Sequence, residues 1–595
     1  NALQVNTTGA NNTAVGRSAL GVNTTGANNS SFGMNSMIAN TTGGSNVAIG
    51  GSALTANTTA SNNVAVGNDA LAANTTGANN VSIGAASLDA NTTASNNVAV
   101  GVNTLGVNTT GASNTAIGHE ALDANTTAAN NTAVGFSALK ANTTGTRNTA
   151  VGMESLKTVT TGVDGVALGY KSLRLSTGNS NTGLGSETLG TNSSGASNTA
   201  VGHAALFANT TASNNTAVGH SALIANTTGT NNVAMGVNSL DANTTGDFNV
   251  AIGTAALTSN TTADSNTAVG QNSMAANTTG TRNSSFGIES LDANTTGSDN
   301  TAFGGFALTT ATTASQNTAV GRNAGAAITT GSSNVSIGYV SLSTNTTGGA
   351  NTAIGHQALF ANTTAGANTA VGKDALTANT TGSANTGVGN LAGDAITTGS
   401  NNSCFGSNAG GGITTGGTNT IIGEAAALAL TTGSNNVALG QDAARNNQPG
   451  GELTTASNQI MIGNGNATNA FIKIDWTVTS DKRDKTDIEP MTMGLDLVNK
   501  LEPVTYRWDD RHNYKNFTPD GTHKKPELQG GLLAQDVEIL ERKYGYKVED
   551  KTSILTDKTK DGNYGLTYSK FIPVLINAVQ ELSTQVDELK QELKT

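Results

Sequence analysis

The 17 residues NTTGANNTAVGRSALGV at positions 6–22 recur, with substitutions, along most of the chain. From Asn6 onward, 26 copies follow one another to the copy that begins at Leu430. One step is only 16 residues long, before Leu175, and a degenerate copy begins at Leu453. A repeat of this kind indicates a solenoid, in which each copy adds one structural unit to a continuous stack.

We number the positions of each copy as slots 1–17, starting from the first Asn. Slot 11 is Gly in all 26 copies, slot 10 is always apolar, and slot 15 is Leu or Met in 21 copies. Small residues dominate slot 9, which also holds Cys404. We therefore expect Cys404, the only cysteine, to be a small core residue.

Slot 7 is Asn in 25 copies, and the exception is Gly165. Asn and Gly both tolerate a left-handed backbone with positive φ. This pattern predicts a turn at slot 7. Stacked Asn side chains would in addition form hydrogen-bonded ladders along the axis.

Slots 15 and 1 exchange volume. Where slot 15 loses its Leu, slot 1 becomes apolar three residues later, as in Gly325 with Ile328, Gly393 with Ile396, Gly410 with Ile413, and Ala427 with Leu430. Losing a core Leu without replacement costs roughly 2–5 kcal/mol. The two slots are therefore predicted to fill the same interior space.

The repeat is too short for helical repeats, which need about 33 residues or more, and its Asn, Thr and Gly are poor helix formers. The T-A-V-G and S-A-L pieces predict two short strands per copy. A single Pro before residue 490, Pro449, suits an unbroken ladder. We predict a mainly β fold, a parallel β-solenoid shaft over residues 1–463. Its core is thin, which favours three chains side by side.

Composition excludes several classes of function. The net charge of −11 argues against a nucleic-acid partner, and the chain lacks the run of about 18 apolar residues that membrane insertion requires. One Cys and scarce, irregular Asp predict no metal and no cofactor. Charge is uneven, since residues 1–472 hold 10 Lys/Arg and 18 Asp/Glu, whereas residues 473–595 hold 19 and 22.

This change of composition predicts a connector at 464–479 and a small α+β domain at 480–595. Its closing segment, about 567–595, carries apolar residues at alternating spacings of four and three: Leu575, Val579, Leu582, Val586, Leu589 and Leu593. This heptad pattern is typical of a coiled coil. Two or three copies of the chain are therefore expected to meet there.

The N-T-A-V-G…S-A-L pattern of residues 6–463 resembles the head repeats of trimeric autotransporter adhesins, which are left-handed β-rolls in trimers. It is more similar still to the N-T-A-V-G repeats of phage-type tail-fibre proteins. The resemblance, rather than the spacing, implies a left-handed β-roll in a homotrimer.

Four ordered segments of the last part resemble the intramolecular chaperone domain of endosialidase-type phage tailspikes, the S74 peptidase family, over about residues 475–595. They are SDKRDKTDIEP (480–490), LVNKLEPVTYRWDD (497–510), QGGLLAQDVEIL (529–540) and YGLTYSKFIPVLINAVQEL (564–582). The resemblance implies a trimerising module that guides folding of the preceding shaft. Nucleation at one end would fix the register of identical coils, which can otherwise pair out of step.

In many members of that family the chain is cut before the Ser of an S-D-x-R-L-K motif. Carried over, the nucleophile is Ser480, the base is Lys485, and the scissile bond joins Thr479 to Ser480. A neutral, buried Lys can activate a Ser hydroxyl. This chain has Asp484 where the family has Leu, and an acid there favours the protonated amine. Self-cleavage by a single-turnover Ser-Lys peptidase and retention of an uncut chain therefore both remain open. Two other motif residues are expected to orient the loop or to pair with each other: Asp481 and Arg483.

The combined prediction is a homotrimeric tail fibre, in a virion or as an extracellular filament, that reaches and attaches to a host surface. Its expected partners are itself, a glycan or protein receptor, and a tail or baseplate protein at the N-terminal end. The receptor zone is placed at 441–479. The alternatives are a bacterial trimeric adhesin, although anchor strands are lacking at the C-terminus, and an ice- or surface-binding solenoid. A depolymerising enzyme would need a recurrent carboxylate pair, which residues 6–440 lack.

Overall fold

The computed structural model describes residues 1–445, 451–467, 470–471, 473, 478–511, 514–558 and 562–594. The chain divides into two compact units, Asn1–Ala353 and Ile354–Thr595. Both contain solenoid coils, and the second also contains the C-terminal region. Parts of the predicted connector and receptor zone, residues 446–450, 468–469, 472 and 474–477, lie outside the described residues.

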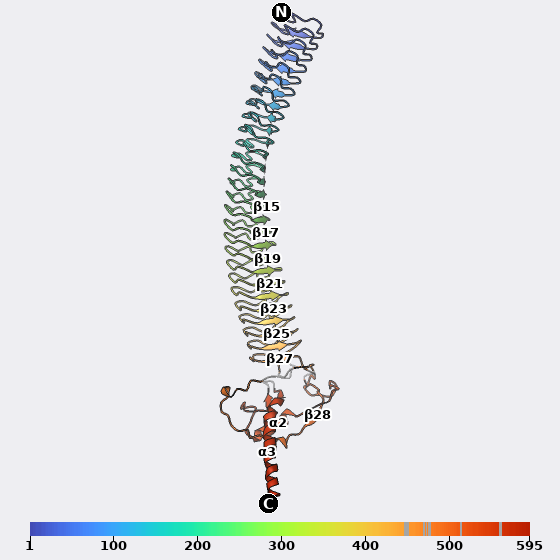
Figure 1. Cartoon of the computed structure of the whole chain (residues 1–595), viewed down its shortest axis with the longest axis vertical. Coiled ribbons are helices and arrows are strands. Elements are labelled where there is room, and N and C mark those ends of the chain that lie inside the picture. Colours follow the sequence, from blue (N-terminus) through green and yellow to red (C-terminus); the bar gives the residue numbers. More distant parts are fainter. Residues whose placement is uncertain are drawn as a thin grey trace. The chain divides into compact units, whose positions relative to one another are not determined.

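In the first unit every coil contributes one strand of three residues, at slots 8–10, and successive coils lie one against the next (Figure 1). Each strand pairs in parallel with the strand of the next coil, as Thr13 does with Ser30. The strands are β1 (Thr13–Val15), β2 (Ser30–Phe32), β3 (Val47–Ile49), β4 (Val64–Val66), β5 (Val81–Ile83), β6 (Val98–Val100), β7 (Thr115–Ile117), β8 (Thr132–Val134), β9 (Thr149–Val151), β10 (Val166–Leu168), β11 (Thr182–Leu184), β12 (Thr199–Val201), β13 (Thr216–Val218), β14 (Val233–Met235), β15 (Val250–Ile252), β16 (Thr267–Val269), β17 (Ser284–Phe286), β18 (Thr301–Phe303), β19 (Thr318–Val320) and β20 (Val335–Ile337).

Strand β21 (Thr352–Ile354) spans the division between the units. The coils of the second unit repeat the same parallel pairing, from Thr369 with Thr386 to Val437 with Ile460. Their strands are β22 (Thr369–Val371), β23 (Thr386–Val388), β24 (Ser403–Phe405), β25 (Thr420–Ile422), β26 (Val437–Leu439) and β27 (Ile460–Ile462). The predicted parallel solenoid of 17-residue coils is confirmed.

The predicted second strand is wrong, because the S-A-L piece forms turns. In the first coil Ser18 and Leu20 have φ of 62° and 49°, and the same two slots are left-handed in coil after coil. A left-handed backbone costs Leu roughly 1–2 kcal/mol. Full burial of a Leu side chain returns about 1.5–3 kcal/mol, and Leu20 is completely buried. Tertiary burial therefore decides the backbone conformation at slot 15.

The left-handed turn predicted at slot 7 is also wrong, since the positive φ lies at slot 6, as at Asn11 with 62°. Slot 7 is Asn because the Asn side chain forms hydrogen bonds between coils. The backbone N–H of Asn29 donates to Asn12 Oδ1 at 2.9 Å, and Asn29 Nδ2 donates to the carbonyl of Gly43 at 2.9 Å. Slot 1 forms a second ladder, as in Asn23 Nδ2 to Asn6 Oδ1 at 2.7 Å. The prediction of axial Asn ladders is confirmed.

The slot 11 glycines are required by both conformation and space. Gly33 has φ of 141°, and a Cβ there would lie 2.3 Å from the carbonyl oxygen of Gly50 in the next coil. No other residue fits such a close approach of two backbones. This explains why slot 11 never varies along the repeats.

The coil that was predicted to begin at Leu175 begins at Ser176, and it is itself one residue short. Leu175, predicted to open a copy, is 37% exposed. Ser176 is buried instead, and its Oγ accepts from Asn192 Nδ2 at 3.0 Å, as a slot 1 Asn would. Ser176 therefore occupies slot 1, and the missing residue belongs to the turn that follows it.

The core confirms the exchange of volume between slots 15 and 1. Ile328 and Ile396 are fully buried, and a Cβ on Gly393 would lie 2.9 Å from Cδ1 of Ile396. Cys404 is fully buried, and its burial raises the pKa of the thiol to about 12, which fits the predicted small core residue.

The C-terminal region mixes short helices and strands. Two antiparallel pairs form, β28 (Val504–Tyr506) with β29 (Gln529–Gly531), and β30 (Thr556–Lys558) with β31 (Tyr564–Leu566). The helices are η1 (Lys482–Asp484), α1 (Leu495–Val498), α2 (Ala534–Lys543), η3 (Tyr568–Lys570) and α3 (Phe571–Glu592). A small core joins α1, α2 and α3 through Met493, Leu497, Val537, Leu555, Phe571 and Val574. The α+β region with its closing helix is as predicted.

The shared space of slots 15 and 1 leads to a swap experiment. Gly393→Leu should lower the free energy of unfolding by about 1–3 kcal/mol, because the added side chain collides with Ile396 and Leu376. Adding Ile396→Asn should recover most of this loss, since the new amide can donate to Asn379 Oδ1, which is buried without a partner. Chemical denaturation measures both variants. A double variant no more stable than the single one would contradict the shared-space explanation.

Candidate functional site

The two predicted catalytic residues lie in contact. Lys485 Nζ donates to Ser480 Oγ at 2.5 Å, and both side chains are exposed to solvent in the single chain. Thr479, whose carbonyl precedes Ser480, is exposed as well. The turn of η1 between Ser480 and Lys485 brings the two side chains together.

Asp481 and Arg483 shape this turn. The Asp481 carboxylate accepts from the backbone N–H of Arg483 at 2.9 Å and caps η1, and it pairs with the Arg483 guanidinium at 2.6 Å. The hydrogen bonds from Arg483 lower the pKa of Asp481 below its ordinary value. The two residues therefore pair and orient the loop, as expected.

A clamp from α3 holds the chain a few residues beyond this turn. Asn577 Nδ2 donates to the carbonyls of Met491 and Met493 at 3.2 and 3.1 Å. Glu581 accepts from the backbone N–H of Leu495 at 2.7 Å, where α1 begins. Heptad spacing alone did not reveal this clamp, because Asn577 and Glu581 lie off the heptad positions.

Glu541 of α2 is a completely buried carboxylate. It accepts hydrogen bonds from the backbone N–H groups of Ile554, Leu555 and Thr556, at 2.9, 2.6 and 3.0 Å. The hydroxyl of Ser553 donates to it as well, at 2.8 Å. Sequence reasoning missed this anchor, because its partners follow α2 by more than ten residues and carry no motif.

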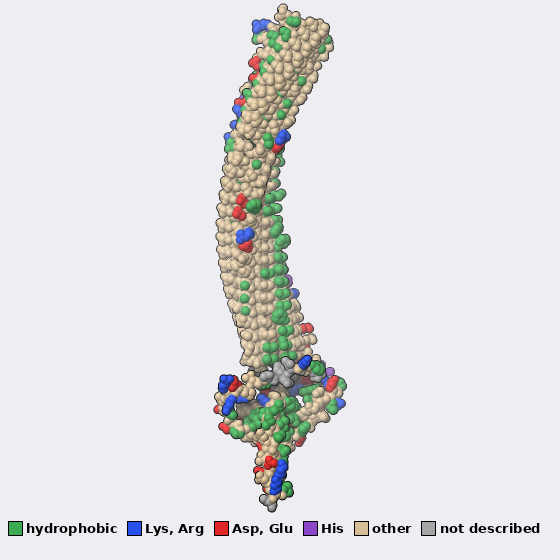
Figure 2. Space-filling model, viewed as in Figure 1, with side chains coloured by type: hydrophobic (Ala, Val, Ile, Leu, Met, Phe, Trp, Pro, Cys, Tyr) green, Lys and Arg blue, Asp and Glu red, His purple; other side chains and the backbone are tan. Residues whose placement is uncertain are grey.

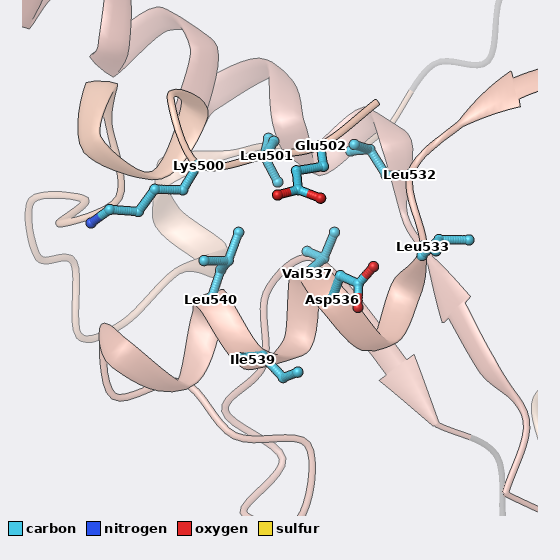
Figure 3. A pocket seen from close by; sticks show the side chains of 9 residues that line it. All are labelled: Lys500, Leu501, Glu502, Leu532, Leu533, Asp536, Val537, Ile539 and Leu540. Atoms are coloured by element: carbon cyan, nitrogen blue, oxygen red, sulfur yellow. The ribbon is translucent and has the colours of Figure 1, made fainter. Parts of the chain in front are cut away.

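A pocket of about 270 Å³ lies between the chain after α1 and the first turns of α2. Figure 3 shows Leu501, Val537 and Leu540 facing one another across it, while the Lys500 amine points away. Carboxylates of Glu502 and Asp536 stand among the lining residues, which also include Leu532, Leu533 and Ile539. The lining holds no Ser, Cys or His, and its ionisable groups are the Lys500 amine and the carboxylates of Glu502 and Asp536.

The helix α3 has two apolar faces, of which only one is covered. Phe571, Val574 and Ala578 are buried against the domain. The heptad residues lie elsewhere on the helix, and Val579, for example, is 65% exposed. All of the predicted heptad positions are exposed in the single chain: Leu575, Val579, Leu582, Val586, Leu589 and Leu593.

The solenoid coils carry a second uncovered apolar surface, the slot 10 row. Figure 2 shows hydrophobic side chains aligned along the coils. In the first unit the exposed members of the slot 10 row are Val15, Phe32, Ile49, Ile83, Ile117, Leu168, Leu184, Met235, Ile252, Phe303, Val320 and Ile337. In the second unit they are Ile354, Phe405, Ile422 and Ile462. Slot 9, one residue earlier, points into the core.

The abundant Thr residues have a structural role. Slot 2 hydroxyls donate to the slot 2 carbonyl of the next coil, as Thr24 Oγ1 does to Thr41 at 3.0 Å. Among the described residues, no group of three or more His, Cys, Asp or Glu side chains could hold a metal ion. Within the same residues, none of the helices combines the length and apolarity needed to cross a membrane.

Removal of the buried carboxylate tests its structural role. Glu541→Ala leaves three N–H groups without an acceptor, and those of Leu555 and Thr556 are buried. An unpaired buried N–H costs about 1–3 kcal/mol, so the C-terminal domain should lose at least about 2 kcal/mol of stability. Hydrogen exchange at Ile554, Leu555 and Thr556 measures the loss. Glu549→Ala is the matched control, because Glu549 is 58% exposed and pairs with Arg542 at the surface. Equal protection in both variants would refute the anchor.

Comparison with known proteins gives one family. No curated protein and no solved structure matches the chain. Residues 480–542 match the family model described as chaperone of endosialidase, Peptidase S74. The match begins at Ser480 and ends within α2. Joined to a parallel solenoid of 17-residue coils, this chaperone-of-endosialidase region gives the chain an architecture consistent with a tail-fibre-like protein.

Proposed function

We propose that the protein is a homotrimeric fibre of the phage tail-fibre type, in a virion or as an extracellular filament, that reaches and attaches to a host surface. The solenoid forms the shaft. The C-terminal domain directs trimerisation, sets the register of the coils, and releases itself by cleavage before Ser480.

The observation that carries this proposal is the pair of uncovered apolar surfaces, the slot 10 row and the heptad face of α3. Large continuous apolar surfaces on a soluble chain mark interaction sites. An occupant of the slot 10 row must present apolar groups at the coil spacing over many coils. A second copy of the chain does so by construction, and the heptads of α3 favour the same partner.

Register explains the need for a C-terminal organiser. Slot 10 alternates among Val, Ile, Leu, Met and Phe without a distinctive order, so a shift by one coil gives nearly the same contacts. The heptads of α3 span only about three repeats, which fixes one alignment at one end of the chain. The coils can then pair from that end onward.

The Ser480–Lys485 contact supports the cleavage step. Lys485, as the neutral amine, removes the Ser480 hydroxyl proton, and Oγ attacks the carbonyl carbon of Thr479. The peptide C–N bond breaks as the C–O ester bond forms, and the Ser480 nitrogen takes up a proton to become a free amine. Water then hydrolyses the ester, which leaves a Thr479 carboxylate and regenerates the hydroxyl.

Both side chains are exposed in the single chain. A lysine amine in water is protonated at neutral pH, and desolvation favours its neutral form. We infer that cleavage follows assembly, when neighbouring copies exclude water from Lys485. Asp484, beside the Lys, slows the reaction because a carboxylate stabilises the protonated amine.

Assembly is tested by the molar mass in light scattering. The reference sample is the Ser480→Ala chain, which stays intact, and it should have the mass of three chains. Val579→Asp places a charge on the heptad face and should shift the protein towards single chains. Thr584→Asp, on an exposed position outside the heptads, should leave the trimer unchanged. If this reference sample had the mass of one chain, the proposed homotrimeric fibre would be wrong.

Cleavage is tested by intact-mass measurement of freshly expressed chains over time. The wild type should yield fragments 1–479 and 480–595, whereas Ser480→Ala and Lys485→Met should stay full-length. Asp484→Leu should accelerate cleavage by removing the acid beside the amine. If the wild type and Asp484→Leu both remain whole in a trimer, the protein keeps its C-terminal domain and the peptidase assignment fails.

A further inference from the structure

One step of the solenoid, from the coil of Val159 to the coil of Ser176, lacks a backbone hydrogen bond that its neighbours have. In the first unit the slot 2 N–H donates to the slot 2 carbonyl of the next coil, as from Thr143 to Thr160 at 2.9 Å and from Thr177 to Ser193 at 2.8 Å. Among the steps between Thr7 and Thr346, only the step from Thr160 to Thr177 lacks this bond. Both threonines are exposed there.

The side-chain ladders stop at the same place. Val159 replaces the slot 1 Asn, so that Oδ1 of Asn142 in the preceding coil is buried without a partner. Gly165 replaces the slot 7 Asn, so this coil has no slot 7 side-chain amide to donate to the next coil. In the preceding coil, Asn148 Nδ2 still donates to the Gly162 carbonyl at 2.8 Å. Both Asn ladders are therefore interrupted within one coil.

The short coil explains the missing bonds. Val166 pairs with Thr182, an offset of 16 instead of 17, because one residue of the turn after Ser176 is absent. The strand face stays paired, with Val166 N–H donating to the Asn181 carbonyl at 2.9 Å. The coils are also hydrogen-bonded on both flanks of slots 1–4, where Thr158 N–H donates to the Arg174 carbonyl at 3.1 Å and Val163 N–H donates to Asn179 Oδ1 at 3.0 Å. The corner formed by slots 1–4 thus lacks its own bonds between two bonded flanks.

Charged side chains gather in the two coils that precede this step. Residues 142–174 carry six of them, in a shaft that has few. Arg147 pairs with Asp164 at 2.6 Å, and Glu154 lies 3.4 Å from Arg174. Both pairs join the coil of Asn142 to the coil of Val159, so they brace the preceding step and do not cross this one.

We propose that this step is a hinge in the shaft. The paired strands β10 and β11 act as the pivot, and the slot 1–4 corner opens and closes. In a parallel assembly in register, the hinges of all copies lie at the same level, so the fibre bends there. A ladder gap alone does not make a hinge. At Ala311 the slot 1 Asn is also lost, yet the step that follows keeps its bond, with Thr312 N–H donating to the Thr329 carbonyl at 3.0 Å.

The hinge is tested by distances between two spin labels on one full-length chain diluted with unlabelled chains. Asn130→Cys with Asn214→Cys spans the hinge, and Asn231→Cys with Gln316→Cys spans the same number of coils, including that of Ala311. Cys404 is buried and does not react with the label. The hinge pair should show a distance distribution about twice as wide as the control pair.

A repaired chain provides the decisive comparison. Val159→Asn, Gly165→Asn and a Thr inserted after Thr177 restore a full coil and both ladders, so the width should fall to that of the control pair. Equal widths for the two pairs in the unrepaired chain would overturn the proposal. Hydrogen exchange on the unaltered protein is independent of the repair: the Thr160 amide should exchange at least about 100-fold faster than that of Thr143. Equal rates would also overturn the hinge.

Discussion

The buried asparagine ladder is the interaction on which the rest of the structure depends. A coil of 17 residues encloses little more than one Leu and two small side chains, so apolar burial by itself is modest. The two columns of Asn side chains occupy the remaining interior and bond each coil to the next. Because buried amides are costly when unpaired, each coil needs its neighbours. The stability of the solenoid is therefore cooperative along its axis, and a residue that interrupts an Asn column destabilises the adjoining coils.

Hydrogen-bonded Asn side chains occupy much of the interior of the solenoid, and one row of apolar residues lies on its surface. The slot 10 side chains point outward because slot 9 points into the core, and alternation along a strand allows no other arrangement. The same division appears in α3, where one face packs on the domain and another stays bare. Each of these elements thus carries a buried face that stabilises the single chain and a bare apolar face that is available to the proposed assembly.

Much of this could be foreseen from the sequence. The repeat length predicted a parallel solenoid, and the paired changes at slots 15 and 1 predicted a shared interior space. The pairing of Ser480 with Lys485 came from the resemblance to the S74 family. The errors have physical reasons. Leu is a poor left-handed residue in isolation, so only burial reveals the turn at Leu20. Asn suits both turns and ladders, so slot 7 was assigned the role that belongs to slot 6. The role of Glu541 could not be predicted, because three of its partners are backbone N–H groups, which carry no sequence signal.

The glycine column at slot 11 has an evolutionary consequence. Because each coil closes on the next through the same backbone contact, whole coils can be duplicated or deleted by recombination within the gene without disturbing either flank. The length of the rod then changes in increments of about 4.8 Å.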